Sequence, residues 1–293
     1  MSPEPESEMG TPSADNVPGR DRALEEFLDT FADHDEQWAG SLHLKVAARL
    51  VELARPQVAD ACLDIGGGDG IVASALGEAV GPTAMVASID LGRRSIELAG
   101  PQAAGNTHRI KGSGDDVMFR DHTFDVVVLS RSIAYESDAY AVIGEATRTL
   151  KVGGRLALFC RRRGLATPAE EAFLTELAVF LRQQGVILPD QFLNYPGLAD
   201  RRELELALRM AGLDHIVFGD VVTGGQTADA AAFNEEMMRC WPAARILLDT
   251  LAGKKRQQFD EQIDRTMRAL GEEAFRYHHP YLLAAGTKGG AVQ

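Results

Sequence analysis

Two spacings of hydrophobic residues alternate through the middle of the chain. Short, nearly continuous apolar runs predict buried strands, and these runs occupy residues 61–65, 84–89, 124–129 and 155–159. Between them, apolar residues recur at helical spacing and predict helices over 71–80, 93–99 and 139–150. Strands that are apolar throughout and alternate with helices indicate an α/β fold, a Rossmann-like, doubly wound, mostly parallel sheet with helices on both faces.

The two ends of the chain differ from this middle part. Residues 1–20 are rich in Pro, Ser and acidic residues, so we expect a disordered tail there. Helical spacing follows from residue 21 and again over 42–53, which predicts N-terminal helices. The whole chain is expected to divide into the tail 1–20, an N-terminal helical cap 21–57, the Rossmann-like core 58–225, a helical lid insertion 226–277, and the last core strand with its tail 278–293.

The C-terminal part of this division rests on mostly helical patterns. Thr167, Pro168 and Glu170 have the order of a capped helix start. Further helices are predicted at 201–211 and 228–275, and Phe259, Ile263, Met267 and Leu270 are expected to share one helix face. Strands are predicted at 216–218 and 281–285, and Gly153 and Gly154 are predicted to form the turn that leads into the run 155–159.

Composition and charge exclude several classes of protein. The 293 residues include 45% hydrophobic and 25% charged ones, with a formal net charge of −13. Such a chain is typical of a soluble, globular, cytoplasmic protein, and its acidity argues against a nucleic-acid partner. No apolar run is long enough to span a membrane, and the N-terminus lacks the features of a secretory signal.

Only three cysteines occur, Cys62, Cys160 and Cys240, and they lack metal-ligand spacing. We therefore expect core thiols rather than disulfides, and no metal site.

The segment 63–70 (LDIGGGDG) closes one predicted strand and opens the next helix. Glycines at such a turn let the backbone approach a ligand closely and adopt positive φ angles. A turn at the carboxyl edge of a doubly wound sheet is where nucleotide-like ligands bind. Ile71 stands where a dinucleotide fingerprint beginning at Gly66 would need a small residue, so NAD is not the expected ligand.

Four segments together resemble one family. Asp64 and the glycines after it form D-x-G-x-G-x-G, and Asp90 ends the second predicted strand. Segment 124–128 (FDVVV) resembles the fourth strand, and 145–156 (EATRTLKVGGRL) resembles the block R-x-L-K-P-G-G-x-L, with Val152 in place of proline. Over residues 58–160 the chain thus resembles class I S-adenosylmethionine (SAM)-dependent methyltransferases, closest to the subgroup with ubiquinone and menaquinone C-methyltransferases. The resemblance implies SAM as cofactor and S-adenosylhomocysteine (SAH) as product.

The resemblance also implies which residues hold SAM. Asp90 is expected to accept hydrogen bonds from both ribose hydroxyls, and the glycine backbone to lie against the methionine part. Asp64 is expected to orient the turn or reach the amino group, whereas Asp69 is expected to serve as a helix-start carboxylate. The expected cofactor-binding residues are Asp64, Gly66, Gly67, Gly68, Asp90, Leu91, Ser113, Gly114, Asp115 and Ser130.

The adenine segment departs from the subgroup pattern Gly-Asp-Ala-x-x-Leu-Pro-Phe. In segment 112–119 Ser113 stands where the pattern has Asp, and Asp115 and Asp116 follow two and three residues later. Either carboxylate could contact adenine, Ser113 could replace the missing acid, or both acids could be solvated loop residues.

Two residues are candidates for proton transfer. Many relatives have a His-His pair at positions 134 and 135, where this chain has Ala134 and Tyr135. Tyr135 could orient or deprotonate an acceptor, but a phenol with a pKa near 10 is a poor base, so a role as a wall residue stays open. His34 has a suitable pKa for a base, and its alternative is a solvated position at a helix end.

Two further residues are candidates for acceptor binding. Arg161 directly follows the fifth strand and could hold a carboxylate or phosphate of the substrate, or else pair with Glu170 and Glu171. Trp241 lies in the helical insertion beside Met237 and Met238, which could line the acceptor site or belong to an ordinary core.

From these residues we expect a SAM-dependent methyltransferase that acts on an oxygen or carbon of a small organic molecule. Its setting would be bacterial specialised metabolism such as antibiotic biosynthesis. A SAM-binding cyclase or other non-methylating enzyme, and a noncatalytic SAM-binding partner subunit, are the alternatives. The expected partner is the small-molecule acceptor, a homodimer is compatible with the chain, and the acceptor's identity is left open.

Overall fold

A computed structural model describes residues 39–92, 97, 106–130, 138–162, 166–185, 198, 200–240, 245, 248–249, 251, 253–271 and 274–290. The predicted tail 1–20, the helix predicted from residue 21 and nearly all of the helix predicted at 93–99 lie outside these ranges.

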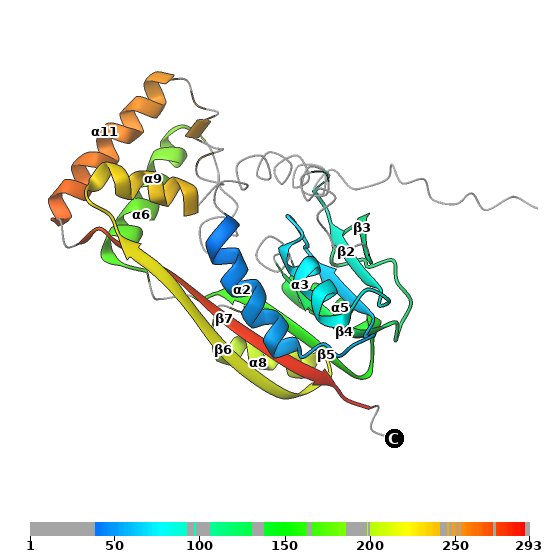
Figure 1. Cartoon of the computed structure of the whole chain (residues 1–293). Coiled ribbons are helices and arrows are strands. Elements are labelled where there is room, and N and C mark those ends of the chain that lie inside the picture. The colour runs from blue at the N-terminus through cyan, green and yellow to red at the C-terminus, as the bar shows by residue number, and fades with distance from the viewer. Residues whose placement is uncertain are drawn as a thin grey trace, which may run out of the picture.

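The described strands form one seven-stranded sheet in the order β3-β2-β1-β4-β5-β7-β6 (Figure 1). The strands are β1 (Cys62–Ile65), β2 (Val86–Asp90), β3 (Thr107–Lys111), β4 (Phe124–Leu129), β5 (Leu150–Arg161), β6 (Leu213–Gln226) and β7 (Arg276–Lys288). The helices are α2 (Ala39–Ala54), α3 (Ile71–Val80), α5 (Ala139–Thr149), α6 (Pro168–Gln183), α8 (Arg201–Met210), α9 (Ala230–Cys240) and α11 (Gly253–Leu270).

Strands β1 to β5 run parallel, and β7 is antiparallel to both of its neighbours, β5 and β6. The inner strands β1, β2 and β4 are buried on both faces, so their sequences are mostly apolar. The predicted mixed α/β, mostly parallel fold is confirmed, and so are the boundaries of α3 and β4.

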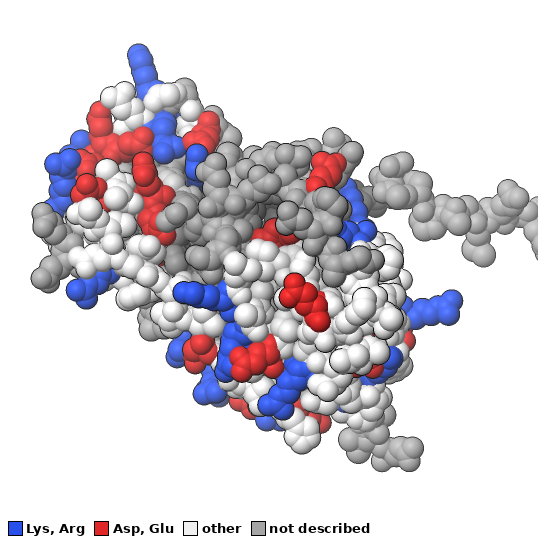
Figure 2. Space-filling model, in the orientation of Figure 1, with Lys and Arg blue, Asp and Glu red and all other residues white. Residues whose placement is uncertain are grey.

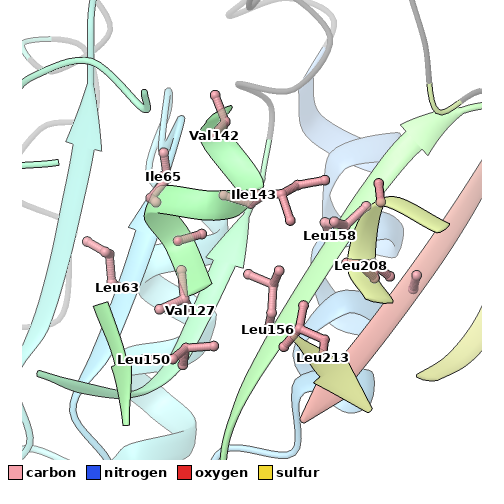
Figure 3. Close-up of a cluster of buried hydrophobic side chains, with 14 of the residues drawn as sticks. Leu63, Ile65, Val127, Val142, Ile143, Leu150, Leu156, Leu158, Leu208 and Leu213 are labelled. Carbon is pink, nitrogen blue, oxygen red and sulfur yellow. The ribbon is translucent and has the colours of Figure 1, made fainter. Parts of the chain in front are cut away.

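A separate hydrophobic core lies on each face of the sheet. Helices α5 and α8 cover one face, where Ile143 and Leu208 meet strand residues such as Leu63 and Leu156 (Figure 3). Helices α2 and α3 cover the other face, with Leu50 of α2 among the fully buried residues.

Cys62 and Cys160 are buried free thiols, and burial raises the pKa of each to about 12. Their prediction as core residues is confirmed, whereas the Cys240 side chain lies outside the described part of the chain.

The structure corrects several sequence predictions. Strand β3 was not predicted, because it is a half-exposed outer strand with the polar sequence THRIK. Gly153 and Gly154 lie inside β5 rather than before it, where the pairing with β4 shifts from Leu150 to Arg155 across an irregularity. Strands β6 and β7 extend far beyond the predicted 216–218 and 281–285. Leu270 is 39% exposed, so it does not share the buried face of Phe259, Ile263 and Met267.

Helices α6, α9 and α11 form a third core, and we call these three helices the helical lobe. Phe259 of α11 packs against Phe173 and Phe180 of α6, with ring centroids 6.2 and 5.3 Å apart. The division of the chain into regions stays a prediction, but α6, which that prediction places in the core region, packs with the helices of the insertion.

The helical lobe joins the sheet through the β6–β7 pair. That pairing continues over 222–226 and 276–280, beyond the last pair between β5 and β7, which joins Arg161 to Tyr281. Figure 1 shows these two long strands reaching the lobe. Since β5 ends at this edge, the lobe lies at the carboxyl edge of the sheet, the same edge that carries the glycine turn.

Charges are mixed on the described surface that Figure 2 shows. Lys and Arg are interspersed with Asp and Glu over the helical lobe and along the edge of the sheet. This face therefore has no basic patch of the kind that binds phosphate backbones. In the part of the chain described, no helix combines the length and apolarity that a membrane crossing requires.

Candidate functional site

The glycine turn between β1 and α3 depends on glycine at each position. Gly66, Gly68 and Gly70 have φ angles of 78°, 48° and 80°, in the left-handed region that residues with side chains avoid. Gly67 is needed for a different reason: a β-carbon there would overlap Ser88 Oγ and lie 3.0 Å from Asp64 Oδ2. The turn therefore lies directly against the ends of β1 and β2.

Asp90 holds this turn in place from the end of β2. Its two carboxylate oxygens accept hydrogen bonds from the backbone N–H groups of Gly68 and Gly92, each at 2.8 Å. A carboxylate offers about four lone-pair sites, so these two bonds do not use its whole capacity. The geometry fits a residue that shapes the site and also accepts ligand hydroxyls. Leu91, the neighbouring candidate, lies half-buried beside it.

Asp64 lies beneath the turn and is fully buried. Neither carboxylate oxygen has a hydrogen-bond partner among the described residues. Burial raises the pKa of this carboxyl to about 7, and the negative charges of Asp90 and Asp69 act in the same direction. Asp69 itself accepts a hydrogen bond from the N–H of Ile71 at 3.2 Å, which is the helix-start role expected for it.

Ser130 connects the end of β4 to the glycine turn. Its N–H donates to the Ile65 carbonyl at 3.0 Å, and its hydroxyl donates to the Gly66 carbonyl at 2.7 Å. Ser130 therefore positions the turn.

A cavity opens beside Ser130, between α2, the turn, and the ends of β4 and β5. Its empty volume is about 300 Å³, part of which is open to solvent. It is mostly apolar and is lined by Val46, Ala47, Gly67, Asp69, Ile71, Val72, Ser130 and Phe159.

The segment after β3 lies next to Asp90, because the Gly112 N–H donates to the Asp90 carbonyl at 3.0 Å. Ser113 Oγ donates to Asp115 Oδ1 at 2.5 Å, and Gly114 is buried. Asp115 and Asp116 are exposed. The structure thus brings the segment with Ser113, Gly114 and Asp115 next to the end of β2, and their contact with adenine stays a prediction.

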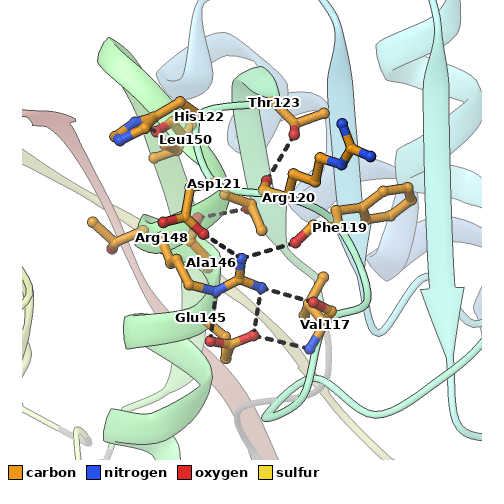
Figure 4. A network of polar contacts seen from close by, with 12 residues as sticks. Val117, Phe119, Arg120, Asp121, His122, Thr123, Glu145, Ala146, Arg148 and Leu150 are labelled. Atoms are coloured by element: carbon orange, nitrogen blue, oxygen red, sulfur yellow. Dashed lines mark hydrogen bonds and ion pairs between the residues drawn. The ribbon is translucent and has the colours of Figure 1, made fainter.

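A polar network on α5 anchors the continuation of that segment (Figure 4). The Arg148 guanidinium donates to the carbonyls of Val117 and Phe119 and to the carboxylates of Glu145 and Asp121, at 2.7–2.8 Å. Glu145 accepts the Val117 N–H at 3.0 Å. Hydrogen bonds from Arg148 lower the pKa of both carboxyls, so the network stays charged. The motif block 145–156 therefore serves partly to hold the segment that follows β3.

The Arg161 side chain is paired within the protein, whereas a role in substrate binding would require it to face a ligand. Its guanidinium is 11% exposed and lies 3.6 Å from the buried carboxylate of Glu170. It also donates to the His278 carbonyl at 3.4 Å. Glu170 in turn completes the capping box with Thr167 and accepts the His278 N–H. These contacts explain the charge of Arg161 without a ligand, and its role in substrate binding stays a prediction.

The remaining candidates cannot be placed in this way. His34, Tyr135 and Trp241 lie outside the described residues. Met237 and Met238 are buried in the core of the helical lobe, as ordinary packing predicts. No group of side chains suited to a metal ion occurs within the described ranges.

Sequence reasoning missed Ser88 and Phe159. Ser88 stands out only as the one hydroxyl in the otherwise apolar start of β2, and Phe159 looks like any core residue of a strand. Nothing in the sequence indicates that Ser88 lies beside the turn or that Phe159 lies beside the cavity.

Comparison with known proteins matches the region that carries these features. Residues 63–158 match the family described as "Methyltransferase domain". The ubiquinone/menaquinone biosynthesis C-methyltransferase of Stutzerimonas stutzeri is 25% identical over 234 residues, which cover 73% of this chain and 90% of that protein. The nocamycin O-methyltransferase of Saccharothrix syringae is 35% identical over 147 residues, covering 49% of this chain and 50% of that protein.

Solved structures are similar in fold. The YcgJ protein of Bacillus subtilis gives a TM-score of 0.57 at 16% identity, over 84% of this chain and 99% of that one. The Haemonchus contortus phosphoethanolamine N-methyltransferase 2, solved with phosphomonomethylethanolamine and SAH, gives 0.54 at 17% identity, over 91% of this chain and 60% of that one.

The close packing at Gly67 generates a stability prediction. We expect Gly67→Ala to lower the free energy of unfolding by about 1–3 kcal/mol, since the added methyl group must displace Ser88 or Asp64. Urea denaturation measures this change. Gly144→Ala is the control: Gly144 is exposed in α5, its β-carbon would meet nothing within 4 Å, and the change should stabilise by up to about 1 kcal/mol. Adding Ser88→Ala to Gly67→Ala should restore part of the loss, and a Gly67→Ala protein as stable as wild type would contradict the packing argument.

The contact between Arg161 and Glu170 generates a second prediction. Glu170→Ala removes half of a capping box and leaves Arg161 without this carboxylate, so we expect a loss of about 3 kcal/mol in unfolding free energy. Glu171→Ala, one residue along and exposed, should cost only a few tenths of a kcal/mol. Arg161→Ala should also lower the melting temperature. If instead it raised only the KM of an acceptor and left stability unchanged, the substrate role would be the right one.

Proposed function

We propose that this chain, a SAM-dependent methyltransferase with the class I fold, transfers the methyl group of SAM to an oxygen or carbon of a small organic acceptor. The methyltransferase match covers the glycine turn, Asp90, the segment after β3 and the network of Arg148. The relatives described above are named as a C-methyltransferase and an O-methyltransferase. These names favour methylation over a cyclase or a noncatalytic partner subunit.

The single observation that carries the proposal is the geometry of the turn with Asp90. The carboxylate of Asp90 and the backbone at Gly66–Gly68 form one rigid unit, joined by the hydrogen bond from the Gly68 N–H. The buried carboxylate of Asp64 lies directly beneath Gly67, which lines the cavity, and a carboxylate there suits the positive charge of SAM. When bound, SAM supplies a methyl group on a positively charged sulfur and leaves as SAH.

The residues around the cavity indicate how the protein would hold the methyl acceptor. Methyl transfer to an oriented acceptor depends mainly on holding the two reactants in near-attack geometry. The cavity walls from α2, α3 and β5 are apolar, with Asp69 and Ser130 as the polar side chains among the lining residues. We infer an apolar or aromatic acceptor, held by its shape against these walls. His34 and Tyr135 remain the proposed candidates for proton transfer, and Trp241 and Arg161 those for acceptor binding.

The biological setting is proposed on a narrower basis. The nocamycin O-methyltransferase match supports specialised metabolism of the antibiotic type. A cytoplasmic location and a homodimer are proposals that rest on the sequence alone.

Asp90 gives the first test of the cofactor site. We expect Asp90→Ala to weaken the binding of SAM and SAH by at least about tenfold, and both equally, because the two ligands share the ribose whose hydroxyls Asp90 would accept. Isothermal titration calorimetry measures both constants, with NAD as the ligand that should not bind. Unchanged affinity in the variant would remove Asp90 from the site, and equally tight NAD binding would point to another cofactor.

The reaction itself is tested with methyl-labelled SAM. Purified protein should transfer label to at least one member of a set of phenolic, enolic and polyprenyl acceptors. Phe159→Ala should raise the acceptor KM more than that of SAM, since Phe159 lines the cavity away from the Asp90 side of the turn. If SAM binds and no acceptor class is labelled, methylation of these classes is refuted.

A further inference from the structure

A buried carboxylate without a partner is rare in a folded protein, because water solvates the ionised form far better than an apolar interior does. Asp64 is such a group. It is 0% exposed, and both of its oxygens lack a hydrogen-bond partner among the described residues. It lies directly beneath the glycine turn: a β-carbon at position 67 would lie 3.0 Å from Asp64 Oδ2, and Gly67 itself lines the cavity.

The charged groups that act on Asp64 come from β2, β3 and the turn. Asp90 at the end of β2 and Asp69 in the turn are negative, and both oppose ionisation of Asp64. Ser88 on β2 and Arg109 on β3 occupy the same row of the sheet, since Asp64 pairs in register with Ser88, and Ser88 with Arg109. Arg109 is near enough for Asp69 and Asp64 to raise its pKa, against the lowering effect of its own burial. Two negative charges and one positive charge therefore surround this carboxylate. Burial raises the pKa of Asp64 and outweighs the Ser130 hydroxyl and the Ala73 N–H, which favour its charged form.

We propose that Asp64 makes ligand binding selective for the charge at the sulfur position: it releases its proton to solvent when a ligand with a positive charge there occupies the glycine turn, and keeps it when that position is uncharged. This inference rests on the proposed function, because SAM and SAH are the two ligands it concerns. They share adenine, ribose and the amino acid part, so Asp90 and segment 112–115 cannot distinguish them. They differ in one methyl group and one positive charge, and a carboxylate near the turn responds to that charge. Asp64 thus favours the reactant over the product.

The sign of the pH dependence follows from the direction of the pKa shift. Burial raises the pKa of Asp64 from 3.8 to about 7, so in the free protein it is protonated below neutral pH. A bound positive charge stabilises the ionised form and lowers this pKa, so SAM should bind more tightly as the pH rises through about 6 to 8. SAH has no sulfonium charge, so its affinity should change little over the same range. Lowering the pKa by one unit corresponds to about a tenfold increase in the ratio of SAM to SAH affinity.

The test is calorimetry with the full chain at several pH values between 5.5 and 8. The ligands are SAM, SAH and sinefungin, in which an amine replaces the sulfonium. For the wild type we expect the SAM and sinefungin affinities, relative to SAH, to rise about tenfold with pH. Near pH 6.5, titrations in buffers of different ionisation enthalpy should report release of about half a proton per SAM bound, and none for SAH.

Asp64→Asn keeps the shape of the side chain and removes its titration. In this variant the SAM-to-SAH ratio should no longer depend on pH, and proton release near pH 6.5 should vanish. Glu78→Gln removes an exposed carboxylate from α3 and is the matched control, which should behave like wild type. A wild-type ratio that is flat with pH, or a pH dependence that persists in Asp64→Asn, would overturn the proposal.

Two readouts separate this inference from the proposed function. If wild type binds neither SAM nor SAH at any pH, the cofactor assignment fails, and the inference with it. If both bind with a constant ratio of affinities, the cofactor assignment stands and only the inference fails.

Thermal denaturation without ligand gives an independent check. Because the carboxyl pKa is raised in the folded state, the folded protein loses stability as the pH rises from about 4 to 7. The Asp64→Asn variant should therefore have a higher melting temperature than wild type at pH 8 and a similar one at pH 4.

Discussion

Asp90 is the residue on which the geometry of the whole site depends. Its carboxylate accepts the N–H groups of Gly68 and Gly92, and its carbonyl accepts the N–H of Gly112. Three loops that follow three neighbouring strands are therefore held by one residue at the end of β2. A parallel sheet brings such loops to one edge but does not fix the distances between them. The hydrogen bonds to Asp90 fix those distances. Any ligand in the turn meets a surface that is already assembled, so binding need not order the loops first.

The sequence was informative where a short local pattern determines the structure. Helix α3, strand β4 and the capping box of α6 depend on residues close together in the chain, and all three were predicted. Strand β3 was missed because it is polar and lies at the edge of the sheet, where only pairing with β2 marks it as a strand.

The same distinction applies to the site. Asp64 and Asp90 could be found from a motif, whereas the approach of Ser88 to Gly67 depends on the register between β1 and β2. The contact of Arg161 with Glu170 was weighed only as pairing in a solvated loop. The sequence could not show that the capping box buries this carboxylate or that β7 joins the contact.

The burial of Asp64 shows how stability and binding oppose each other at this turn. A shift of its pKa from 3.8 to about 7 corresponds to a destabilisation on the order of 4 kcal/mol above neutral pH. Folded domains are stable by only about 5–15 kcal/mol, so this is a large share. Asparagine would fill the same space without that penalty. We therefore attribute the carboxylate at this position to an interaction with a positive charge beyond that of Arg109, which a cationic cofactor would supply.

The acceptor side of the site is built on different principles from the cofactor side. Asp64, Asp90 and the glycine turn lie within 27 residues of the chain, and their geometry follows from β1, β2 and the hydrogen bonds between them. The cavity takes its walls from α2, α3, β4 and β5, which are distant in sequence, and the helical lobe reaches the same edge on the long β6–β7 pair. Changes in α2 or in the lobe can thus alter the acceptor without disturbing the turn. This separation explains why the cofactor could be inferred from the sequence, while the acceptor depends on elements that share no local motif.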